Sequence, residues 1–199
     1  MQKRRIFIAI NLPAGLKKRI LSLRQKWPGL PARWTFEDNL HLTLVFIGYV
    51  GDDQLAEICK ITREVAKKYS PFELKFSRVV YGPSSSAKAS EGKPDSQTRM
   101  IWLEGERSDA LVRLKDDLEN ALLESRRSGF YRKEDRQFKP HLTLARLRDE
   151  WRDYAFKPEI NLEFRETVPV ETIEVMESEL RRAGAEYAVL ETCELKHEE

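Results

Sequence analysis

Two copies of one tetrapeptide carry the residues best suited to chemistry. His41-Leu42-Thr43-Leu44 recurs unchanged as His141-Leu142-Thr143-Leu144, 100 residues later. The sequence contains three histidines, and the third, His197, lies in the charged C-terminal tail. Imidazole is the side chain that exchanges protons most readily near neutral pH. The repeat therefore predicts a duplicated half-site, in which one histidine acts as an acid and the other as a base.

Alternation along a β-strand decides what each copy can present. His41 and Thr43 would share one face, and the two leucines would point into a core on the other. Around a phosphodiester, threonine hydroxyls could hold non-bridging oxygens while one imidazole activates a nucleophile and the other protonates the leaving oxygen. Taken singly, each copy also fits a purely structural strand, since threonine suits strands. Identical duplication around both non-tail histidines favours the catalytic interpretation.

Other chemistries lack their residues in this sequence. Two histidines leave a tetrahedral zinc ion short of ligands, and Cys59 and Cys193 stand far apart outside any Cys-x-x-Cys pair. Neither a Gly-x-Ser-x-Gly nucleophile motif nor a glycine-rich phosphate loop followed by Lys-Ser or Lys-Thr occurs. We therefore expect catalysis without a metal or any other cofactor.

Composition indicates an ordinary globular protein of 199 residues, with 41% hydrophobic and 34% charged residues. The net charge of +2 is too small to argue nucleic-acid binding by itself. The apolar run 6–10 after the basic N-terminus is too short for a signal-peptide core, and no stretch is long enough to span a membrane. We expect a soluble cytoplasmic protein with no membrane contact and no obligatory protein partner.

The order of expected elements repeats along the chain. Strand, helix and motif strand occur at 6–10, 12–27 and 41–47, and again at 100–103, 111–122 and 141–147. A helix at 55–69 and strands at 72–76, 162–168, 172–179 and 187–195 complete the expected elements. The repeat predicts one domain over 1–199 with pseudo-symmetric halves, roughly 1–99 and 100–199. A serine-rich loop, 82–99, would lie between the halves.

The motifs and their surroundings resemble the two-histidine (2H) phosphoesterase superfamily, which carries paired His-x-Thr-x motifs. Within it, the chain looks like the LigT-like RNA 2′,3′-cyclic phosphodiesterases, historically called 2′-5′ RNA ligases. The likeness covers most of the chain. It rests on Arg5–Pro13, Arg33-Trp34, Asn39–Leu44, Phe46–Gly48 and Phe138–Arg146. Two departures are the serine-rich insertion and Phe36-Glu37-Asp38 at a place where relatives often carry prolines.

The resemblance implies a fold, an activity and residue roles. The fold would be bilobal α+β, with two antiparallel β-sheets facing a central cleft and helices on the outside. The activity would be metal-independent hydrolysis of RNA 2′,3′-cyclic phosphodiester ends to 2′-phosphomonoesters. His41 would be the proton donor to the departing 3′ oxygen and His141 the proton acceptor that activates water. Thr43 and Thr143 would bind the substrate, an RNA end such as a tRNA fragment or a small cyclic nucleotide.

Two other functions remain open on the same fold. The same acid and base could join RNA ends by ATP-independent 2′-5′ ligation, the reverse type of reaction. A non-catalytic RNA-binding module is the second alternative, although a pure binder would not need both histidines. Arg146 matches an arginine that follows the second motif in relatives and could contact phosphate. It lies five residues from His141, however, so strand alternation places it on the opposite face unless the strand bulges.

Aromatic residues raise two further questions. Tyr131 and Phe138 alternate with basic residues ahead of His141, in a run that also includes Arg126, Arg127, Phe130, Arg132, Lys133, Arg136 and Lys139. Such a mixture can hold single-stranded nucleic acid, or it can be a solvated loop whose aromatics anchor it to the core. Trp34 and Trp102 are expected to be core residues rather than platforms for base stacking.

Overall fold

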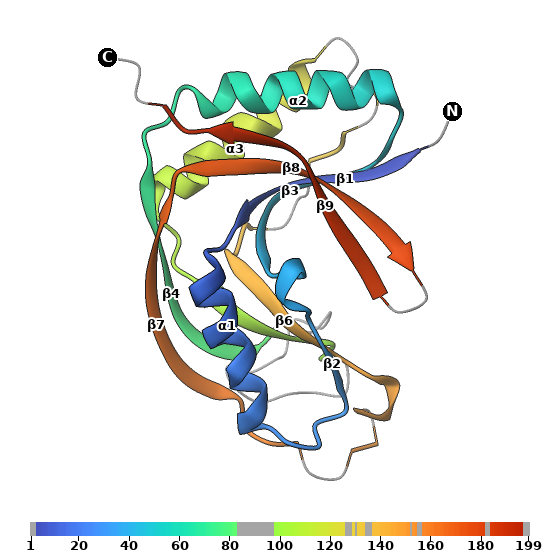
Figure 1. The fold of residues 1–199 in the computed structure, drawn as a ribbon, viewed down its shortest axis with the longest axis vertical. Helices are drawn as coiled ribbons and strands as arrows, with labels where there is room; N and C mark the ends of the chain where they lie inside the picture. The colour runs from blue at the N-terminus through green and yellow to red at the C-terminus, as the bar shows by residue number, and fades with distance from the viewer. Residues whose placement is uncertain are drawn as a thin grey trace.

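An antiparallel sheet forms the frame of the protein in a computed structural model (Figure 1). The structure describes residues 3–82, 98–125, 129, 131–133, 137–151, 153–154, 157–181 and 184–196. Its strands are β1 (Arg4–Asn11), β2 (Ala32–Trp34), β3 (His41–Val50), β4 (Phe72–Tyr81), β5 (Met100–Gly105), β6 (His141–Leu147), β7 (Asn161–Val170), β8 (Thr172–Arg181) and β9 (Gly184–Glu194). Within the described ranges these form one nine-stranded sheet in the order β7-β4-β5-β6-β3-β1-β8-β9, with β2 paired to β6.

The two motif strands meet at the middle of this order. In the described residues β3 and β6 pair at a single position, Leu42 with Leu142, so the strands diverge on either side of it. We call β3, β1, β8 and β9 the first half-sheet, and β6, β5, β4 and β7 the second half-sheet. The predicted α+β class with antiparallel strands is confirmed. The two expected sheets are joined through the leucine pair into one.

The first half-sheet takes strands from both ends of the sequence, and the second takes four strands that follow one another in the chain, β4 to β7. β4 crosses to pair with β5 and β7, and β8 returns to pair with β1. This exchange ties the early and late parts of the chain together. The single domain with halves 1–99 and 100–199 stays a prediction, and 83–97 of the expected serine-rich loop lie outside the described residues.

In the described residues three α-helices pack on the sheet: α1 (Ala14–Ser22), α2 (Asp52–Ala66) and α3 (Asp109–Glu124). α2 and α3 lie against each other, and α2 also contacts β8 and β9 (Figure 1). Ser108 begins α3 by accepting a hydrogen bond from the Leu111 backbone at 3.3 Å. α1 is held to β7 by two bonds from Arg19 to Glu166, at 3.0 and 2.8 Å. No helix in the described ranges has the length and apolar character needed to cross a membrane.

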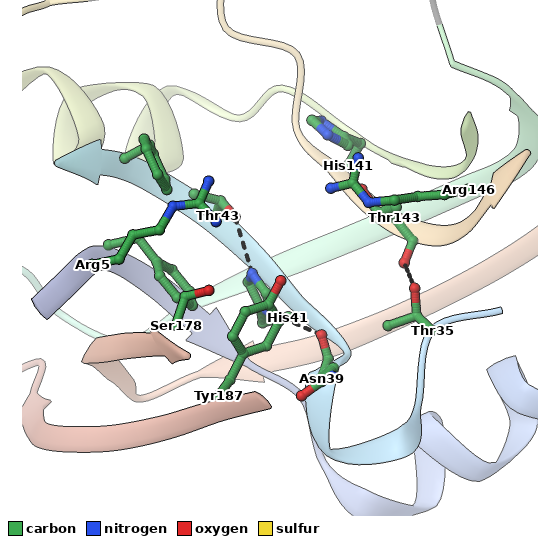
Figure 2. A pocket seen from close by; sticks show the side chains of 12 residues that line it. Arg5, Thr35, Asn39, His41, Thr43, His141, Thr143, Arg146, Ser178 and Tyr187 are labelled. Atoms are coloured by element: carbon green, nitrogen blue, oxygen red, sulfur yellow. Dashed lines mark hydrogen bonds between the residues drawn. The ribbon is translucent and has the colours of Figure 1, made fainter. Parts of the chain in front are cut away.

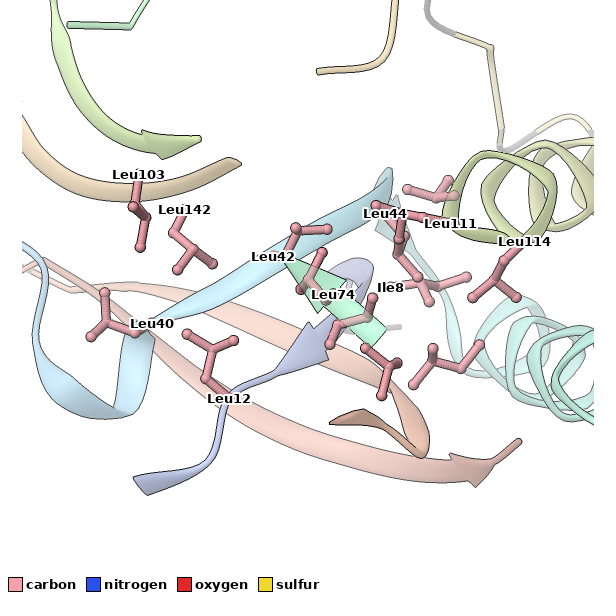
Figure 3. Close-up of a cluster of buried hydrophobic side chains, with 14 of the residues drawn as sticks. Ile8, Leu12, Leu40, Leu42, Leu44, Leu74, Leu103, Leu111, Leu114 and Leu142 are labelled. Atoms are coloured by element: carbon pink, nitrogen blue, oxygen red, sulfur yellow. The ribbon is translucent and has the colours of Figure 1, made fainter. Parts of the chain in front are cut away.

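The hydrophobic core fixes which way the motif strands face. Leu42, Leu44, Leu142 and Leu144 are all buried and belong to one core cluster with residues of α3. Figure 3 shows the first three of these leucines with Leu111 and Leu114 of α3. Burying a leucine side chain contributes about 1.5–3 kcal/mol, so rotating either strand to expose its leucines would cost several kcal/mol. Packing of the leucines thus determines the direction of the histidines.

The sequence misplaced some strand boundaries. β2 was missed, because three residues are too few to show a periodic pattern. Gly48, expected to end its strand, lies inside β3 with φ of 101°, a left-handed conformation that glycine adopts without strain. The register of β1 on β3 shifts beside it, from Ile6 opposite Gly48 to Phe7 opposite Phe46. The glycine therefore accommodates a bulge instead of terminating the strand.

Candidate active site

Both tetrapeptides present their polar side chains to one pocket. His41 and Thr43 from β3, and His141 and Thr143 from β6, line it and are half-buried, while the intervening leucines are buried. Figure 2 shows the four side chains together with Arg146. The pocket is also lined by Arg5, Phe7, Thr35, Asn39, Phe46, Ser178 and Tyr187. All five site residues expected from the sequence thus meet in one place.

The ring of His41 is held by its own segment and by two aromatic neighbours. Its Nδ1 lies 2.8 Å from the Asn39 carbonyl oxygen, and its Nε2 lies 3.1 Å from Thr43 Oγ1. Phe7 and Tyr187 pack on the ring with centroid separations of 4.8 and 5.0 Å. Backbone bonding and packing therefore leave the imidazole little rotational freedom.

His141 repeats the backbone contact in a different environment. Its Nδ1 lies 2.8 Å from the Lys139 carbonyl oxygen, again two residues before the histidine. Trp102 of β5 stacks on the ring with centroids 3.6 Å apart and planes inclined by 19°. Trp102 is 9% exposed, so the expectation of a core residue is confirmed, and it also forms one wall of the site.

These contacts assign the neutral tautomer of both histidines. A carbonyl oxygen can only accept, so Nδ1 of each ring must carry the hydrogen and donate it. The lone pair of the neutral ring then lies on Nε2, which in His41 accepts from the Thr43 hydroxyl. Each motif thus aims the proton-accepting nitrogen away from its backbone. The two rings reach this arrangement through the same local geometry.

Burial lowers the pKa of both histidines. Desolvation is the main cause for His41, and the positive charges of Lys17 and of His141 act in the same direction; the pKa falls to about 4, although the Asn39 carbonyl opposes the shift. Desolvation also lowers the pKa of His141, against the Lys139 carbonyl and the Glu104 carboxylate, both of which raise it. Both imidazoles are therefore neutral at neutral pH.

The two threonines are used differently. The Thr43 hydroxyl donates to His41 Nε2 at 3.1 Å. The backbone of Thr143 is fixed instead, because its carbonyl accepts a 2.7 Å bond from the Thr35 hydroxyl. Thr35 follows β2, the strand that the sequence did not reveal, and its amide also bonds the Leu144 carbonyl at 2.8 Å. β2 thus braces the second motif from its side.

Arg146 lines the pocket because β6 bulges. The register of β5 on β6 passes from Ile101 opposite Ala145 to Trp102 opposite Thr143, which leaves Leu144 as the extra residue. Leu144 and Ala145 are both buried as a result, and Arg146 returns to the face of Thr143. The exception allowed in the sequence analysis, a bulge in the strand, therefore applies, and strand alternation does not keep Arg146 out of the pocket.

β3 carries the matching bulge. Its register on β1 passes from Val45 opposite Ile8 to Thr43 opposite Ala9, which skips Leu44. Phe46, five residues after His41, then lines the pocket as Arg146 does on the other strand. The guanidinium of Arg5 lies over the Phe46 ring at 4.7 Å from its centroid. The first motif strand therefore also has a positive charge at the position that corresponds to Arg146, and Arg5 of β1 supplies it.

Sequence reasoning missed several lining residues. Arg5 belongs to a basic run that could add to a basic rim but is more typical of a solvated terminus, and Ser178 and Tyr187 carry no motif at all. Alternation along β8 and β9 could have predicted that Ser178 and Tyr187 share one face of the sheet. It could not have predicted that this face lines the pocket. Only strand order could have found them, because β8 lies beside β1.

The basic and aromatic run ahead of His141 anchors to the core where it is described. Tyr131 is 5% exposed and donates to Glu119 at 2.7 Å, while Lys115 and Lys133 also pair with that carboxylate. Phe138 packs on the core and lies under Lys115. This agrees with the anchored-loop interpretation for the two described aromatics. The remaining members 126–127, 130 and 136 lie outside the described residues.

The described part of the chain contains no group of three or more His, Cys, Asp or Glu side chains placed to hold a metal ion. Cys59 and Cys193 are free thiols, and burial raises the pKa of both, to about 12 and about 11. The polar groups that converge in the pocket are imidazole, hydroxyl, guanidinium and the amide of Asn39. Such a set can move protons and bind an anionic oxygen cluster.

Comparison with known proteins gives consistent matches. The model of the 2′-5′ RNA ligase superfamily matches residues 12–182. An RNA 2′,3′-cyclic phosphodiesterase of Thermotoga maritima is 29% identical over 201 aligned positions, which cover 96% of each chain.

Two crystal structures share the fold over nearly the whole length. The protein TT0787 of Thermus thermophilus superimposes with a TM-score of 0.79 at 26% identity, covering 98% of this chain and 100% of that one. E. coli LigT complexed with 3′-AMP gives a TM-score of 0.75 at 26% identity, with the same coverage. The similarity therefore includes both motif strands and the sheet that joins them.

Proposed function

This chain belongs to the 2′-5′ RNA ligase superfamily, and on that basis we propose that it hydrolyses RNA 2′,3′-cyclic phosphodiester ends to 2′-phosphomonoesters. One observation carries the proposal. The imidazoles of two identical motifs, each with its Nδ1 held by a backbone carbonyl, line one pocket with the threonines of both motifs and two arginines. That arrangement provides an acid, a base and donors for a phosphate without a metal ion.

In the proposed reaction the two histidines act on opposite sides of the phosphorus. His141 Nε2 takes a proton from water as the water oxygen forms a bond to phosphorus. The bond from phosphorus to the 3′ oxygen breaks, and His41 Nε2–H gives its proton to that oxygen. The 2′ ester survives as a 2′-phosphate, and the two rings return to their starting states by exchanging protons with solvent.

Charge develops on the non-bridging oxygens during this step. Thr143 and Arg146 lie on β6 with His141, the histidine that activates water in the proposed reaction, and Thr43 lies beside His41. Hydroxyl and guanidinium groups held in a half-buried pocket stabilise such charge more than water does, because they are already oriented. We assign substrate binding to these three side chains.

The low pKa of His41 makes its role depend on the substrate. A donor with a pKa of about 4 is unprotonated at neutral pH before substrate binds. A cyclic phosphodiester brings one negative charge close to the ring, and a nearby opposite charge favours the protonated form. We therefore propose that substrate binding charges His41, so that the acid is generated where it is used.

The substrate class follows the family and the relatives. The similar proteins are named for RNA 2′,3′-cyclic phosphates, and the similar LigT structure holds 3′-AMP. We propose RNA fragments with cyclic ends, such as cleaved tRNA, or small cyclic nucleotides as substrates in the cytoplasm.

Ligation is the second candidate, because the family is described by 2′-5′ RNA ligase activity. Joining uses a 5′ hydroxyl in place of water, and the same base can activate either nucleophile. Analysis of products separates the two reactions, since hydrolysis leaves a 2′-phosphate of unchanged length and joining lengthens the strand.

One assay tests the proposal against both alternatives. RNA with a 2′,3′-cyclic phosphate end is incubated with the protein and excess EDTA, and the ends and lengths of the products are determined. We expect a 2′-phosphate of unchanged length, formed by the wild type and lost in His41→Ala and His141→Ala. A longer strand would establish ligation. Binding of the RNA without any product would establish a non-catalytic module.

A further inference from the structure

The first half-sheet places an unused cation at the edge of the pocket. The guanidinium of Arg5 lies over Phe46, and among the described residues it forms no ion pair with a carboxylate. Its neighbour Arg4, by contrast, lies 3.8 Å from Asp52 and 3.7 Å from Glu177. An aromatic face holds a guanidinium in place but leaves its N–H donors in the ring plane free for an anion.

A hydroxyl without a partner lies beside this cation. Ser178 is 6% exposed, and its Oγ has no hydrogen-bond partner among the described residues although it lines the pocket. Most buried side-chain polar atoms are paired, so a buried hydroxyl that faces a pocket without a protein partner is available to bond to a ligand. β1 pairs Ile6 with Glu177 of β8, and the next residues of this antiparallel register are Arg5 and Ser178. The two donors are therefore neighbours across adjacent strands.

Arg5 and Arg146 lie at opposite ends of the pocket. Phe46 and Arg146 occupy equivalent positions on the two antiparallel motif strands, so these two residues lie in opposite directions from the paired leucines. The guanidinium of Arg5 lies over the Phe46 ring and therefore marks one of the two ends. Figure 2 shows the two arginines on opposite sides of the histidines, with Ser178 and Tyr187 on the side of Arg5. The pocket thus has two cationic ends, although a single phosphate lies between the histidines in the proposed reaction.

The direction of the proposed reaction determines which group of the substrate lies near Arg5, so this step rests on the proposed function. The leaving 3′ oxygen belongs to the ribose and is protonated by His41, so the terminal nucleoside must lie on the side of His41. That side is built from β1, β3, β8 and β9. The next anionic group of an RNA on this side is the phosphate attached to the 5′ oxygen of the terminal nucleoside.

We propose that Arg5 and Ser178 form a second phosphate subsite, which binds the phosphate on the 5′ oxygen of the terminal nucleotide. The guanidinium supplies charge-assisted hydrogen bonds and the hydroxyl supplies one further donor. This subsite makes the protein prefer an RNA end over a nucleoside cyclic phosphate that lacks a 5′ phosphate.

Product analogues test the subsite without turnover. Dissociation constants are measured for adenosine 2′-monophosphate and for adenosine 2′,5′-bisphosphate, which share the 2′ phosphate and differ at the 5′ position. We expect the wild type to bind the bisphosphate about tenfold more tightly or better, because a hydrogen bond to a charged group contributes about 1.5–3 kcal/mol. Arg5→Gln should reduce this preference to about twofold or less, and Arg5→Lys should restore part of it. Ser178→Ala should reduce it by a smaller factor.

Arg4→Gln is the matched control, since it removes a neighbouring arginine that points to surface carboxylates. It should keep the full preference for the bisphosphate. Equal affinity of the wild type for both ligands would overturn the subsite. Equal weakening of both ligands by Arg5→Gln would also overturn it, because Arg5 would then serve the phosphate between the histidines.

Turnover of an RNA with a 2′,3′-cyclic phosphate end, which carries the phosphate on the 5′ oxygen of its terminal nucleotide, is measured in parallel and separates the two proposals. A preserved preference for the bisphosphate without any turnover would refute the proposed hydrolysis and leave the subsite intact. Turnover without the preference would refute the subsite alone. Turnover together with a preference that Arg5→Gln abolishes supports both.

Discussion

The two halves of the site have the same residues and different surroundings. In each, Nδ1 of the histidine donates to the carbonyl two residues earlier, and a bulge follows at the second leucine of the motif. Around them the neighbours diverge. His41 lies between Phe7 and Tyr187, whereas His141 is stacked on Trp102.

The difference extends to charge and to the threonines. His41 is affected by the positive charge of Lys17, while the carboxylate of Glu104 opposes the loss of protons from His141. The Thr43 hydroxyl is bonded to its histidine, and a bond of that kind is absent for Thr143 among the described residues. Identical local geometry thus fixes the orientation of both rings, and the tertiary neighbours make their acidities unequal.

Removal of either imidazole should produce the largest effect. We expect His41→Ala and His141→Ala to lower kcat on a cyclic-phosphate substrate by about 100- to 10,000-fold, since each removes a general acid or base. His197→Ala in the tail is the matched control and should keep the wild-type rate. A near-normal rate for either pocket variant would contradict the paired mechanism.

Titration of the two rings should show their inequality directly. In NMR titrations of the ligand-free protein, His41 should titrate near pH 4 and His141 below its ordinary value of 6.5. Adenosine 2′-monophosphate should raise the pKa of His41, because its phosphate is an opposite charge. The kcat/KM profile should accordingly peak on the acid side of neutrality. Two coincident titrations near 6.5 would contradict the role assigned to burial.

The same shift has a consequence for stability. The unfolded chain binds a proton at His41 below about pH 6.5, and the folded protein does so only near pH 4. The contribution is fully present above pH 6.5 and is lost as the pH falls toward 4, by about 3 kcal/mol in total. The unfolding free energy of His41→Gln, measured with urea at several pH values, should lack this part of the acid dependence. Parallel profiles for the two proteins would refute it.

The leaving group should distinguish the two roles. A phosphodiester with a 4-nitrophenolate leaving group needs no proton donor, so it should rescue His41→Ala at least about tenfold more than His141→Ala. Rates of both variants on this ester and on an alkyl ester provide the measurement. Equal rescue of both variants would refute the assignment of His41 as proton donor and His141 as proton acceptor. Greater rescue of His141→Ala would indicate that the two roles are exchanged.

Removal of either threonine hydroxyl should lower activity by a smaller factor than removal of an imidazole. Thr43→Val and Thr143→Val keep the β-branched shape and delete the hydroxyl, so each should lower kcat/KM by about 10- to 150-fold through one lost hydrogen bond to a charged oxygen. Only Thr43→Val should also change the titration of His41, since only that hydroxyl is bonded to its ring. Unchanged kinetics in both variants would mean that the hydroxyls are structural.

A chelator should have the smallest effect. Two imidazoles carry both proton transfers in the proposed mechanism, so excess EDTA should leave the rate within about twofold of its starting value. Wild-type protein is assayed before and after chelation and dialysis. Complete loss of activity that is restored by zinc or manganese would replace the two-histidine mechanism with a metal-assisted one.

Local pattern was enough to predict much of the fold and the centre of the site. Alternation placed Leu42 and Leu142 in the core and turned His41 and His141 away from it, as the structure has them. Strand and helix periods located most elements, because each depends on neighbours within a few residues. The repetition of the tetrapeptide identified the histidines, since chemistry of this kind needs two proton-transfer groups.

The tertiary structure determines which residues surround those histidines. Arg146 enters the pocket only because Leu144 is extra in the ladder with β5, and a bulge depends on the partner strand. Arg5 and Ser178 line the same pocket only because β8 pairs with β1 across a large separation in sequence. The low pKa of His41 likewise arises from burial among Phe7, Tyr187 and distant charges. Desolvation and strand pairing depend on long-range contacts, which a local sequence pattern does not specify.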